Sequence, residues 1–447
     1  MDKYTDIKRK FILILLVLFI GNITEGQTDL KNPGNQVNDS LSLKEIINKV
    51  IATYPTVKVA EEAINNAEAR VGLARTGYYP EVDMNANFSN LGPVTTLTIP
   101  NMGSFQLYPE NNYSASINYR QVIYDFGRTR QTIEFEKENK ALGEQTLEQT
   151  KQKLSLMAVS NFYTLLFLQS AIMIKNEELT ALNEHLSQIN KMKETGSATE
   201  YQVLSTKVRI SAVESQKVDL EAAIKVQQAL LNTLIGNDQS QHSLVRNELN
   251  AEMTLIPEDS ILSFAMQHRD EVLMNQKRTA LAELRYGITK LQYKPVISFA
   301  ASGGAKNGYV PELYDLKANY VVGLGIRVPI FDGMKTKYNL LQAQSAITSL
   351  SYESDYIKRN VSSEIVDAET YMLSSEEKVN QYSLQLEQAL KAYSLAVTSF
   401  NAGVITNLDL LDSNTSVSES RLLFLKAKID YVASTYKFKA ALGERLY

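Results

Sequence analysis

The sequence contains no cysteine and no tryptophan, and it has only three histidines in 447 residues. The absence of cysteine excludes disulfides, thiolate metal sites and cysteine nucleophiles, and three histidines leave little material for metal or acid–base chemistry. An excess of positive charge is also missing, because 46 basic residues stand against 50 acidic ones and the formal net charge is -4. This balance argues against nucleic-acid binding. Glycine (20) and proline (10) are scarce, as expected of a largely helical chain.

Two long runs without proline dominate the chain, one from Gly127 to Thr195 and one from Met334 to Asn401. Apolar residues recur every three or four positions, with Lys, Glu, Gln and Asn on the other faces, which is typical of a coiled-coil seam. At about 1.5 Å of rise per residue, each helix would span roughly 100 Å. Shorter helices are expected at 41–53, 57–76, 200–235 and 258–292.

The first 26 residues have the features of a secretory signal. A basic region at 3–10 precedes an unbroken apolar stretch at 11–20, which is too short to cross a bilayer as a helix. Cleavage is expected after Gly26, and the alternative is an uncleaved N-terminal anchor. No cysteine follows for a lipid anchor, and no helical membrane span is expected after the signal.

Between the helices the apolar period changes from about 3.6 to 2. Apolar and polar residues alternate over 82–89 and 113–120, and strands are also expected at 296–302 and 320–328. Such alternation predicts strands with one apolar and one polar face. Loops rich in Gly, Asn and Pro join each pair of strands, at 90–112 and at 303–319.

The same order of elements occurs twice in the chain. Three pairs of landmarks are each separated by 207 residues: Asp125 and Asp332 (332 − 125), Gly196 and Gly403 (403 − 196), and Gly236 and Gly443 (443 − 236). This constant spacing predicts that the long helices of the two halves have equal length, as two columns of a rigid tube require.

The repeat divides the chain into seven expected segments. They are a signal peptide (1–26), N-terminal helices (27–80), strands 1 and 2 (81–123), helical hairpin 1 (124–236), a connector with the helices of the second repeat (237–294), strands 3 and 4 (295–330), and helical hairpin 2 (331–447).

Four strands are too few to close a membrane barrel, because known single-chain barrels begin at eight. If the strands enter a membrane, several chains must pool them, and three chains would give twelve. The exported location, the alternating strands and the tyrosines near strand ends favour an outer-membrane barrel. The alternative is a soluble β-hairpin domain whose apolar face packs on protein.

Two short segments carry a family resemblance. One is Phe331-Asp332-Gly333 before the second long helix, and the other is the turn from Ala402 to Asp412, which has a weaker copy from Thr195 to Ser205. With these segments placed in an order of elements that occurs twice, the chain resembles the TolC family of trimeric outer-membrane efflux proteins. The resemblance covers nearly the whole expected mature chain. It implies a mixed fold, mainly α-helical with membrane β-strands, in which a trimer forms a 12-stranded β-barrel continuous with a 12-helix periplasmic α-barrel.

The resemblance also points to residues at the second helix turn. In the family, carboxylates six and nine residues after this glycine line the periplasmic constriction, and here those positions hold Asp409 and Asp412. Three chains would bring six carboxylates around one axis, and their mutual repulsion would raise their pKa values. The spacing of Thr406 and Asp409, like that of Thr199 and Gln202, also predicts a capping box, and one residue can serve both purposes.

The chain departs from the family pattern near the turns. Phe400 and Ile405 stand where some relatives carry Tyr and Arg in a closing network, so a polar lock of that form is not available. The first turn carries Gln202 and Ser205 where further acids could stand. A gate in this chain is therefore expected to depend more on packing.

Two further surfaces follow from the resemblance. The helix turns are the expected docking surface for a periplasmic adaptor (membrane fusion protein), although they can equally be mere connections. Arg120 and Arg327 lie on the polar faces of their strands and are expected to face the barrel lumen, where a structural role is the alternative. The candidate docking residues are Gly196, Ser197, Thr199, Gly403, Val404 and Thr406.

The expected function is that of an outer-membrane exit duct in a tripartite efflux or type I secretion system. The tube would be passive and fed by an inner-membrane pump through the adaptor, with outer-membrane lipid around its strands. No enzyme activity, cofactor, metal or nucleic-acid partner is expected. His268 and Glu271 have a spacing seen in metal sites but favour a solvated helix face. The alternative function is an exported structural or adhesive coiled-coil protein without a pore.

Overall fold

A computed structural model describes residues 40–100, 102–249 and 260–447. The chain divides into two units, Met1–Asp39 and Ser40–Tyr447, and the elements below belong to the second. The expected signal peptide at 1–26 lies outside the described residues.

Two helical hairpins account for about half of the chain. The first consists of α4 (Arg128–Glu194) and α5 (Glu200–Ile235), and the second of α8 (Lys335–Asn401) and α9 (Asn407–Leu442). Both long helices have 67 residues and both shorter ones have 36, so the prediction of equal lengths is confirmed.

An aspartate marks the start of each long helix. A carboxylate oxygen of Asp125 accepts hydrogen bonds from the backbone N–H and the hydroxyl of Thr129, both at 2.6 Å. Asp332 accepts the same two bonds from Thr336, the backbone one at 2.9 Å. These bonds satisfy N–H groups of the first turn, which have no partner within a helix.

Shorter helices precede each strand pair. They are α2 (Leu43–Thr53), α3 (Pro55–Arg75) and the 3₁₀ turn η2 (Thr76–Tyr78) in the first half, and α6 (Ile261–His268), α7 (Asp270–Lys290) and η4 (Leu291–Tyr293) in the second. The prediction of one continuous helix at 258–292 was wrong, because the backbone of Arg269 is extended (φ -68°, ψ 129°). The buried guanidinium of Arg269 binds the carbonyl oxygen of Ala441, near the end of α9, at 3.2 Å.

Four strands form one antiparallel sheet in the order β1 (Glu81–Asn90), β4 (Asn111–Tyr124), β5 (Val296–Lys306) and β6 (Lys317–Arg327). β1 and β6 are the edges, and among the strands of the described residues each has a neighbour on one side only. The loop predicted at 90–112 contains a second sheet of two short strands, β2 (Thr96–Ile99) and β3 (Gly103–Gln106). Sequence reasoning missed this hairpin because four-residue strands are too short to establish an alternating pattern.

The register gives the main sheet one apolar face and one largely polar face. Met84 pairs with Ile117, which pairs with Gly303, which pairs with Tyr320. On the opposite face Asp83 pairs with Asn118. No other described segment covers the apolar face, which includes the exposed residues Val82, Met84, Phe88, Ile117, Tyr320, Val322 and Leu324.

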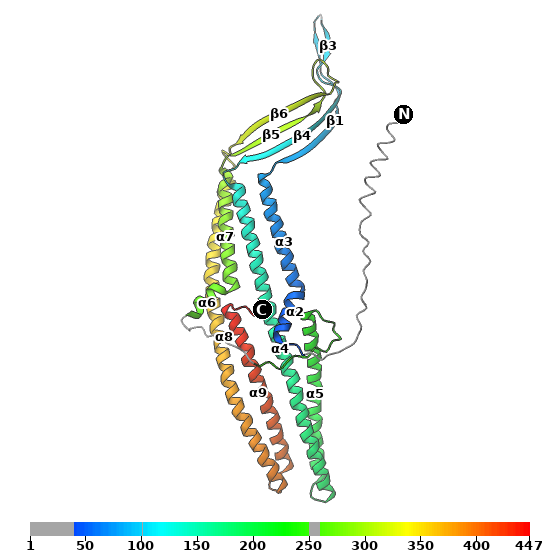
Figure 1. Ribbon diagram of the computed structural model, residues 1–447, viewed down its shortest axis with the longest axis vertical. Helices are drawn as coiled ribbons and strands as arrows, with labels where there is room; N and C mark the ends of the chain where they lie inside the picture. Colours follow the sequence, from blue (N-terminus) through cyan, green and yellow to red (C-terminus); the bar gives the residue numbers. More distant parts are fainter. Residues whose placement is uncertain (1–39, 101, 250–259) are drawn as a thin grey trace, which may run out of the picture. The chain divides into compact units, whose positions relative to one another are not determined.

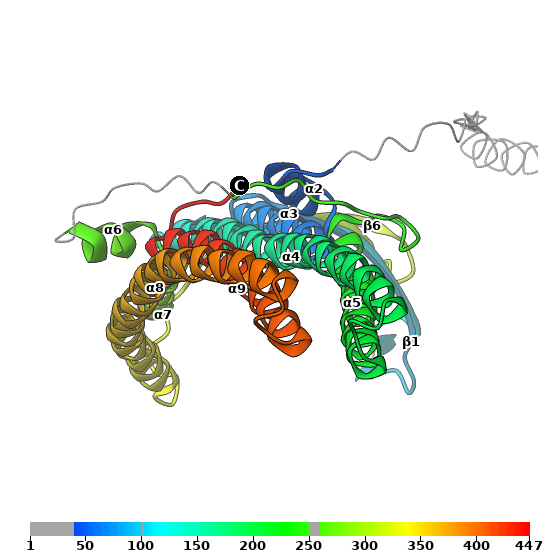
Figure 2. The same cartoon turned by 90° about the horizontal axis from the view of Figure 1, so that it is seen from below.

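The helices form four columns side by side. α4 contacts α3 and α5, and it also contacts α7 and α9, which in turn contact α8. The order is therefore α3 with α5, then α4, then α7 with α9, then α8 (Figure 1). Figure 2 shows that these columns lie along a curved layer, with α2 and α6 on its convex side.

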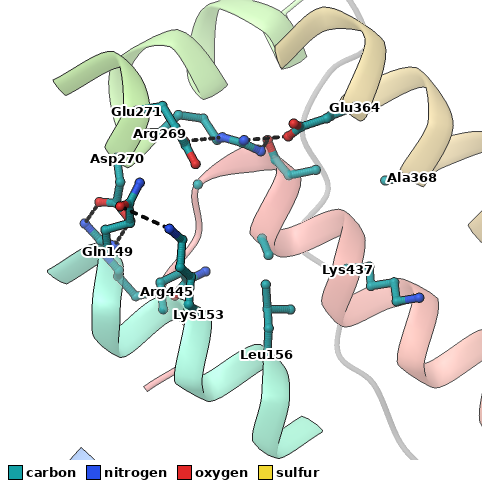
Figure 3. Close-up of a pocket in the computed structure, with 14 residues that line it drawn as sticks. Gln149, Lys153, Leu156, Arg269, Asp270, Glu271, Glu364, Ala368, Lys437 and Arg445 are labelled. Carbon is teal, nitrogen blue, oxygen red and sulfur yellow. Dashed lines mark hydrogen bonds and ion pairs between the residues drawn. The ribbon is translucent and has the colours of Figure 1, made fainter. Parts of the chain in front are cut away.

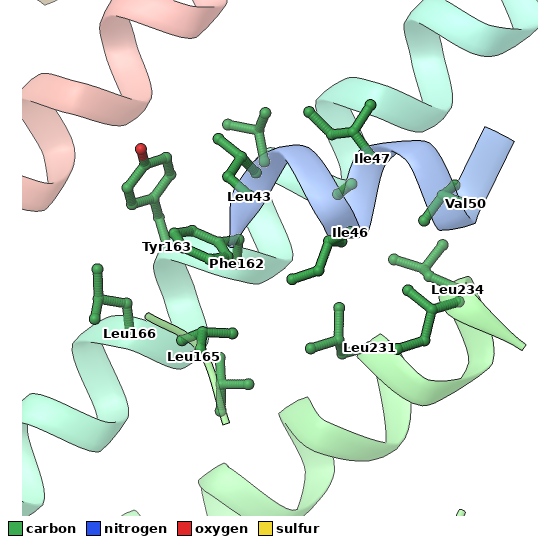
Figure 4. Packing of buried hydrophobic residues seen from close by; sticks show 14 of the residues in the cluster. Leu43, Ile46, Ile47, Val50, Phe162, Tyr163, Leu165, Leu166, Leu231 and Leu234 are labelled. Atoms are coloured by element: carbon green, nitrogen blue, oxygen red, sulfur yellow. The ribbon is translucent and has the colours of Figure 1, made fainter. Parts of the chain in front are cut away.

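The largest hydrophobic cluster lies beneath α2, where this helix packs on α4 and α5 (Figure 4). It includes Ile46, Val50, Phe162, Leu165 and Leu231, none of which is exposed to solvent. The middle of α4 is apolar enough and long enough, by composition, to cross a membrane, which the sequence analysis did not expect. In the structure its apolar residues supply this cluster instead.

One part of the coiled-coil seam is not apolar. Lys and Glu residues were expected on the other faces of the long helices, and Lys175 and Glu178 are exceptions, because both are buried between α4 and α9. The ammonium of Lys175 lies 2.8 Å from the Glu178 carboxylate, and the hydroxyl of Ser418 on α9 donates a 2.5 Å hydrogen bond to the same carboxylate. The charges satisfy one another, which makes their burial possible.

Candidate functional site at the helix turns

The α4–α5 and α8–α9 connections have the same backbone geometry. Gly196 and Gly403 have positive φ angles of 78° and 72°, which favour glycine. The next residue donates its backbone N–H to the carbonyl five positions earlier, from Ser197 to Met192 at 2.7 Å and from Val404 to Ser399 at 2.9 Å. Both helices therefore end in a Schellman motif, which turns the chain sharply.

Both predicted capping boxes are present. Thr199 accepts from the backbone of Gln202, and the Gln202 side chain accepts from the backbone of Thr199 at 2.8 Å. Thr406 and Asp409 form the same reciprocal pair, also at 2.8 Å. Hydrogen bonds from the side chain and then the backbone of Thr406 hold the pKa of Asp409 below its ordinary value. This capping role is confirmed, and the pore-lining role of Asp409 stays a prediction.

Asp412 pairs with a residue that sequence reasoning missed. Its carboxylate lies 2.7 Å from the guanidinium of Arg209 on α5, while the Asp412 side chain is still 61% exposed. Ser205 is the counterpart of Asp412 in the repeat (412 − 207), and Arg209 follows Ser205 by one helical turn. Overlaying the two copies could have suggested this pair, because residues one turn apart share a helix face.

Asn407 joins the helices just above the turns. This buried residue donates to the hydroxyls of Ser205 and Thr206 on α5, at 3.2 and 3.3 Å. Its side-chain oxygen lies 2.6 Å from Nε2 of His185 on α4, and the His185 ring packs edge-on against Phe400 of α8. All four helices of the two hairpins therefore meet at this one level.

Apolar side chains of the two hairpins also pack together at the level of Asn407. Phe400 is buried with Ile189, Val203 and Leu410, and Ile405 packs against this cluster. Phe400 and Ile405 are thus both used in packing, and the dependence of a gate on this packing stays a prediction. The ion pair between Arg209 and Asp412 adds a polar contact that was not expected.

The tips of both turns are exposed to solvent. This holds for all six candidate docking residues, Gly196, Ser197, Thr199, Gly403, Val404 and Thr406. Val404 is an apolar side chain that is 75% exposed. Ala198 and Ile405, by contrast, turn partly inward against the cluster.

Arg120 and Arg327 lie on the same face of the sheet, the one that carries Asp83, but they are not neighbours. Arg120 pairs with Glu81 in the register, and its guanidinium lies 3.6 Å from Asp83. Arg327 pairs with Val296 in the register and, within the described part of the chain, forms no ion pair.

No metal site is apparent among the described residues, since no group of three His, Asp or Glu side chains comes together there. The His268 ring stacks on Phe264 at 4.0 Å, and its Nδ1 lies 2.8 Å from the Phe264 carbonyl. Glu271 binds Arg269. The two residues with metal-like spacing thus have separate structural contacts.

Comparison with known protein families assigns this chain to a family. The model of the outer membrane efflux protein family matches residues 46–237 and 261–444, which include both repeats. The chain belongs to this family. Its members are channels of the outer membrane, and this chain is accordingly an outer-membrane protein of a Gram-negative bacterium, with its helical portion in the periplasm.

Individual members of the family are similar along most of their length. The putative multidrug resistance outer membrane protein MdtQ of Escherichia coli K12 is 24% identical over 426 residues, covering 90% of this chain and 85% of MdtQ. The outer membrane protein TolC of Vibrio cholerae is 20% identical and covers 90% of each chain. The crystal structure of the Campylobacter jejuni CmeC outer membrane channel has a TM-score of 0.77 at 15% identity, covering 95% of this chain and 94% of that one. The fold is therefore that of the family's channels, as the TolC resemblance predicted.

Proposed function

We propose that three copies of this chain join edge to edge into one closed duct. The open edges of β1 and β6 carry this proposal. Unpaired backbone N–H and C=O groups cost several kcal/mol each in lipid, so a membrane sheet must close. Three chains would supply twelve strands and twelve helical columns.

The flanks of the helical layer support the same closure. The end columns carry apolar side chains that the other described residues leave exposed, and exposed apolar surface of this kind can form a protein interface. On the α5 flank these are Tyr201, Leu204, Val208, Val218 and Val226, and on α8 they are Tyr338, Leu341, Tyr352, Tyr356, Val366, Leu373, Leu384 and Leu395. A flank of one copy would pack against the opposite flank of the next, and the ring closes after three.

The two faces of the sheet would then meet different surroundings. The apolar face with Met84, Ile117 and Tyr320 would contact lipid, and the face with Arg120 and Arg327 would line the lumen. The hairpin of β2 and β3 connects the strands at the end away from the helices (Figure 1), and in this arrangement it would lie outside the cell.

At the other end, the turns would form the periplasmic entrance. Three copies would bring Asp409 and Asp412 close to the axis, where six carboxylates attract cations and raise one another's pKa values. In each copy Arg209 would hold Asp412 to α5, so the ion pair would have to yield if the second hairpin moved outward.

The exposed tips of the turns are the proposed docking surface for the adaptor. Contacts at Gly196, Ser197, Thr199, Gly403, Val404 and Thr406 would join the duct to an adaptor and an inner-membrane pump, in a tripartite efflux or type I secretion system. Transport through the tube would be passive, and the chain would act without catalysis. In this scheme the segments are those set out from the repeat, with strands at 81–123 and 295–330 and hairpins at 124–236 and 331–447.

The mass of the purified assembly and its conductance in a planar bilayer test the proposal together. We expect a trimer that requires detergent or lipid and that conducts ions. A soluble rod without conductance would contradict it and would favour the structural coiled-coil alternative.

A test of docking also needs the adaptor. Val404→Asp on the exposed tip should weaken adaptor capture while leaving conductance unchanged.

A further inference from the structure

A groove runs between α4 and α9, the two middle columns of the layer. One part of it is a cavity of about 440 Å³, walled by the apolar and aromatic side chains of Leu156, Val159, Tyr163, Phe167, Ile429 and Ala433. Leu156 and Lys437 also line a second cavity of about 370 Å³, which continues the groove toward α7 (Figure 3). Cavities of this size match those that hold small organic molecules.

The first cavity opens on the concave side of the layer. Phe162 of α4 is buried in the cluster beneath α2 (Figure 4), and α2 lies on the convex side (Figure 2). Ser160 and Thr164 are exposed and line the cavity. Each is two residues from Phe162 along the helix, which places it about 160° away around the axis. The cavity therefore faces away from α2.

The charged residues of this cavity favour an anion. Two lysines, Lys426 and Lys437, line it with a single carboxylate, that of Asp430. Neither lysine forms an ion pair with a described carboxylate, and the Lys437 ammonium lies 5.7 Å from the centre of the Tyr371 ring. Burial raises the pKa of Asp430 above its ordinary value, although Lys426, Lys378 and Lys437 act in the opposite direction. The lysines are eleven positions apart, about three helical turns, so they mark the two ends of the apolar wall.

We propose that this groove binds a small amphipathic organic anion. The aromatic or aliphatic body of the ligand lies against Val159, Tyr163 and Phe167. Its acid group pairs with Lys426 at one end or with Lys437 at the other, and Lys437 must first rotate its side chain away from Tyr371, toward which it points. Such a site combines an apolar pocket with a few well-placed polar groups, as small-molecule sites do.

The groove stays open in a closed ring of chains, because it lies between the middle columns and not on the flanks that would meet a neighbour. Its position on the inner wall of a duct rests on the proposed function, whereas the binding itself does not. On that wall it would hold an anionic cargo on its way through the tube.

The test uses the full chain in lipid nanodiscs and titration calorimetry with naphthalene-2-sulfonate. We expect the sulfonate to bind, and 2-naphthylmethylammonium, a cation of similar size, to bind at least about tenfold more weakly. The double variant Lys426→Gln with Lys437→Gln should weaken sulfonate binding about fivefold. The matched control is Lys428→Gln, since Lys428 lies over Phe424 on the same helix and does not line the groove, and it should change binding less than about twofold.

A second variant tests the apolar wall. Ala433→Trp fills the cavity and should abolish sulfonate binding while the assembly keeps its mass and its conductance. Equal binding of the cation and the sulfonate would overturn the proposal, as would an affinity that neither the lysine variant nor Ala433→Trp changes. If the unmodified chain does not conduct ions, the proposed duct is contradicted and the binding proposal is not. Failure of the duct and failure of the binding site therefore give different results.

Discussion

The two helical hairpins have the same lengths and the same turn geometry, but their polar residues differ. The first turn uses the neutral Gln202 as its cap acceptor and carries Arg209 about two helical turns further on, whereas the second uses Asp409 and carries Asp412. Higher up, the buried pair of Lys175 and Glu178 exists only in the first hairpin, because its counterparts 207 residues later are Tyr382 and Gln385. The two copies thus share their backbone geometry but carry different charged residues at equivalent positions.

The largest expected effect concerns the buried pair. Glu178→Ala leaves the Lys175 ammonium buried without its carboxylate, and this should lower the free energy of unfolding by about 3–5 kcal/mol. The counterpart Gln385→Ala removes an exposed side chain that makes one long hydrogen bond, 3.4 Å to Ser420, and should cost less than about 1 kcal/mol. Denaturant unfolding of the two variants measures the difference. Equal costs would mean that the pair contributes nothing beyond an ordinary surface contact.

The next effect concerns the charge at the turns. Replacing Asp409 and Asp412 together by Asn should raise single-channel conductance and weaken block by divalent cations on the order of tenfold. The matched control changes the equivalent positions of the first turn, Gln202→Ala with Ser205→Ala, and should leave block unchanged. If block persists in the aspartate variant, Asp409 is a helix cap only and Asp412 is only the partner of Arg209.

The smallest effect is a difference in pH dependence between the caps. The pKa of Asp409 is lowered in the folded chain, so its stabilising effect is complete above the ordinary value of 3.8 and is lost as the pH falls through the lowered value. The cap at Gln202 has no such dependence. Hydrogen-exchange protection, corrected for intrinsic rates, should therefore fall in acid at the start of α9 and not at the start of α5. Asp409→Gln should remove the difference, and equal acid sensitivity of both turns would argue against a role for this carboxylate.

Local residue types predicted much of the fold. The glycines at 196 and 403, the capping pairs after them and the proline-free runs before them specify where helices end, and these boundaries agree with the structure to within one residue. The alternation of Val82 to Phe88 likewise predicts a strand, because its two faces meet different surroundings.

What could not be predicted depends on contacts between distant segments. Arg269 interrupts a helical pattern because the end of α9 offers a carbonyl to its guanidinium. Lys175 is buried because Ser418 and Glu178 surround it, and Arg209 meets Asp412 only because α5 and α9 lie side by side at the turns. The division of the chain into segments and the role of the aspartates at the axis depend on assembled chains and stay predictions.

The equal lengths of the helices restrict how such a chain can change. Deleting one residue from α4 would draw everything beyond it up by about 1.5 Å and rotate it by about 100° relative to α8. The two helix turns would no longer lie at the same level. The apolar face of α4 beyond the deletion would rotate away from the helices that it contacts. The helical columns can therefore lengthen or shorten only when both halves change by the same number of residues. A change in the length of the molecule thus requires two matched insertions or deletions.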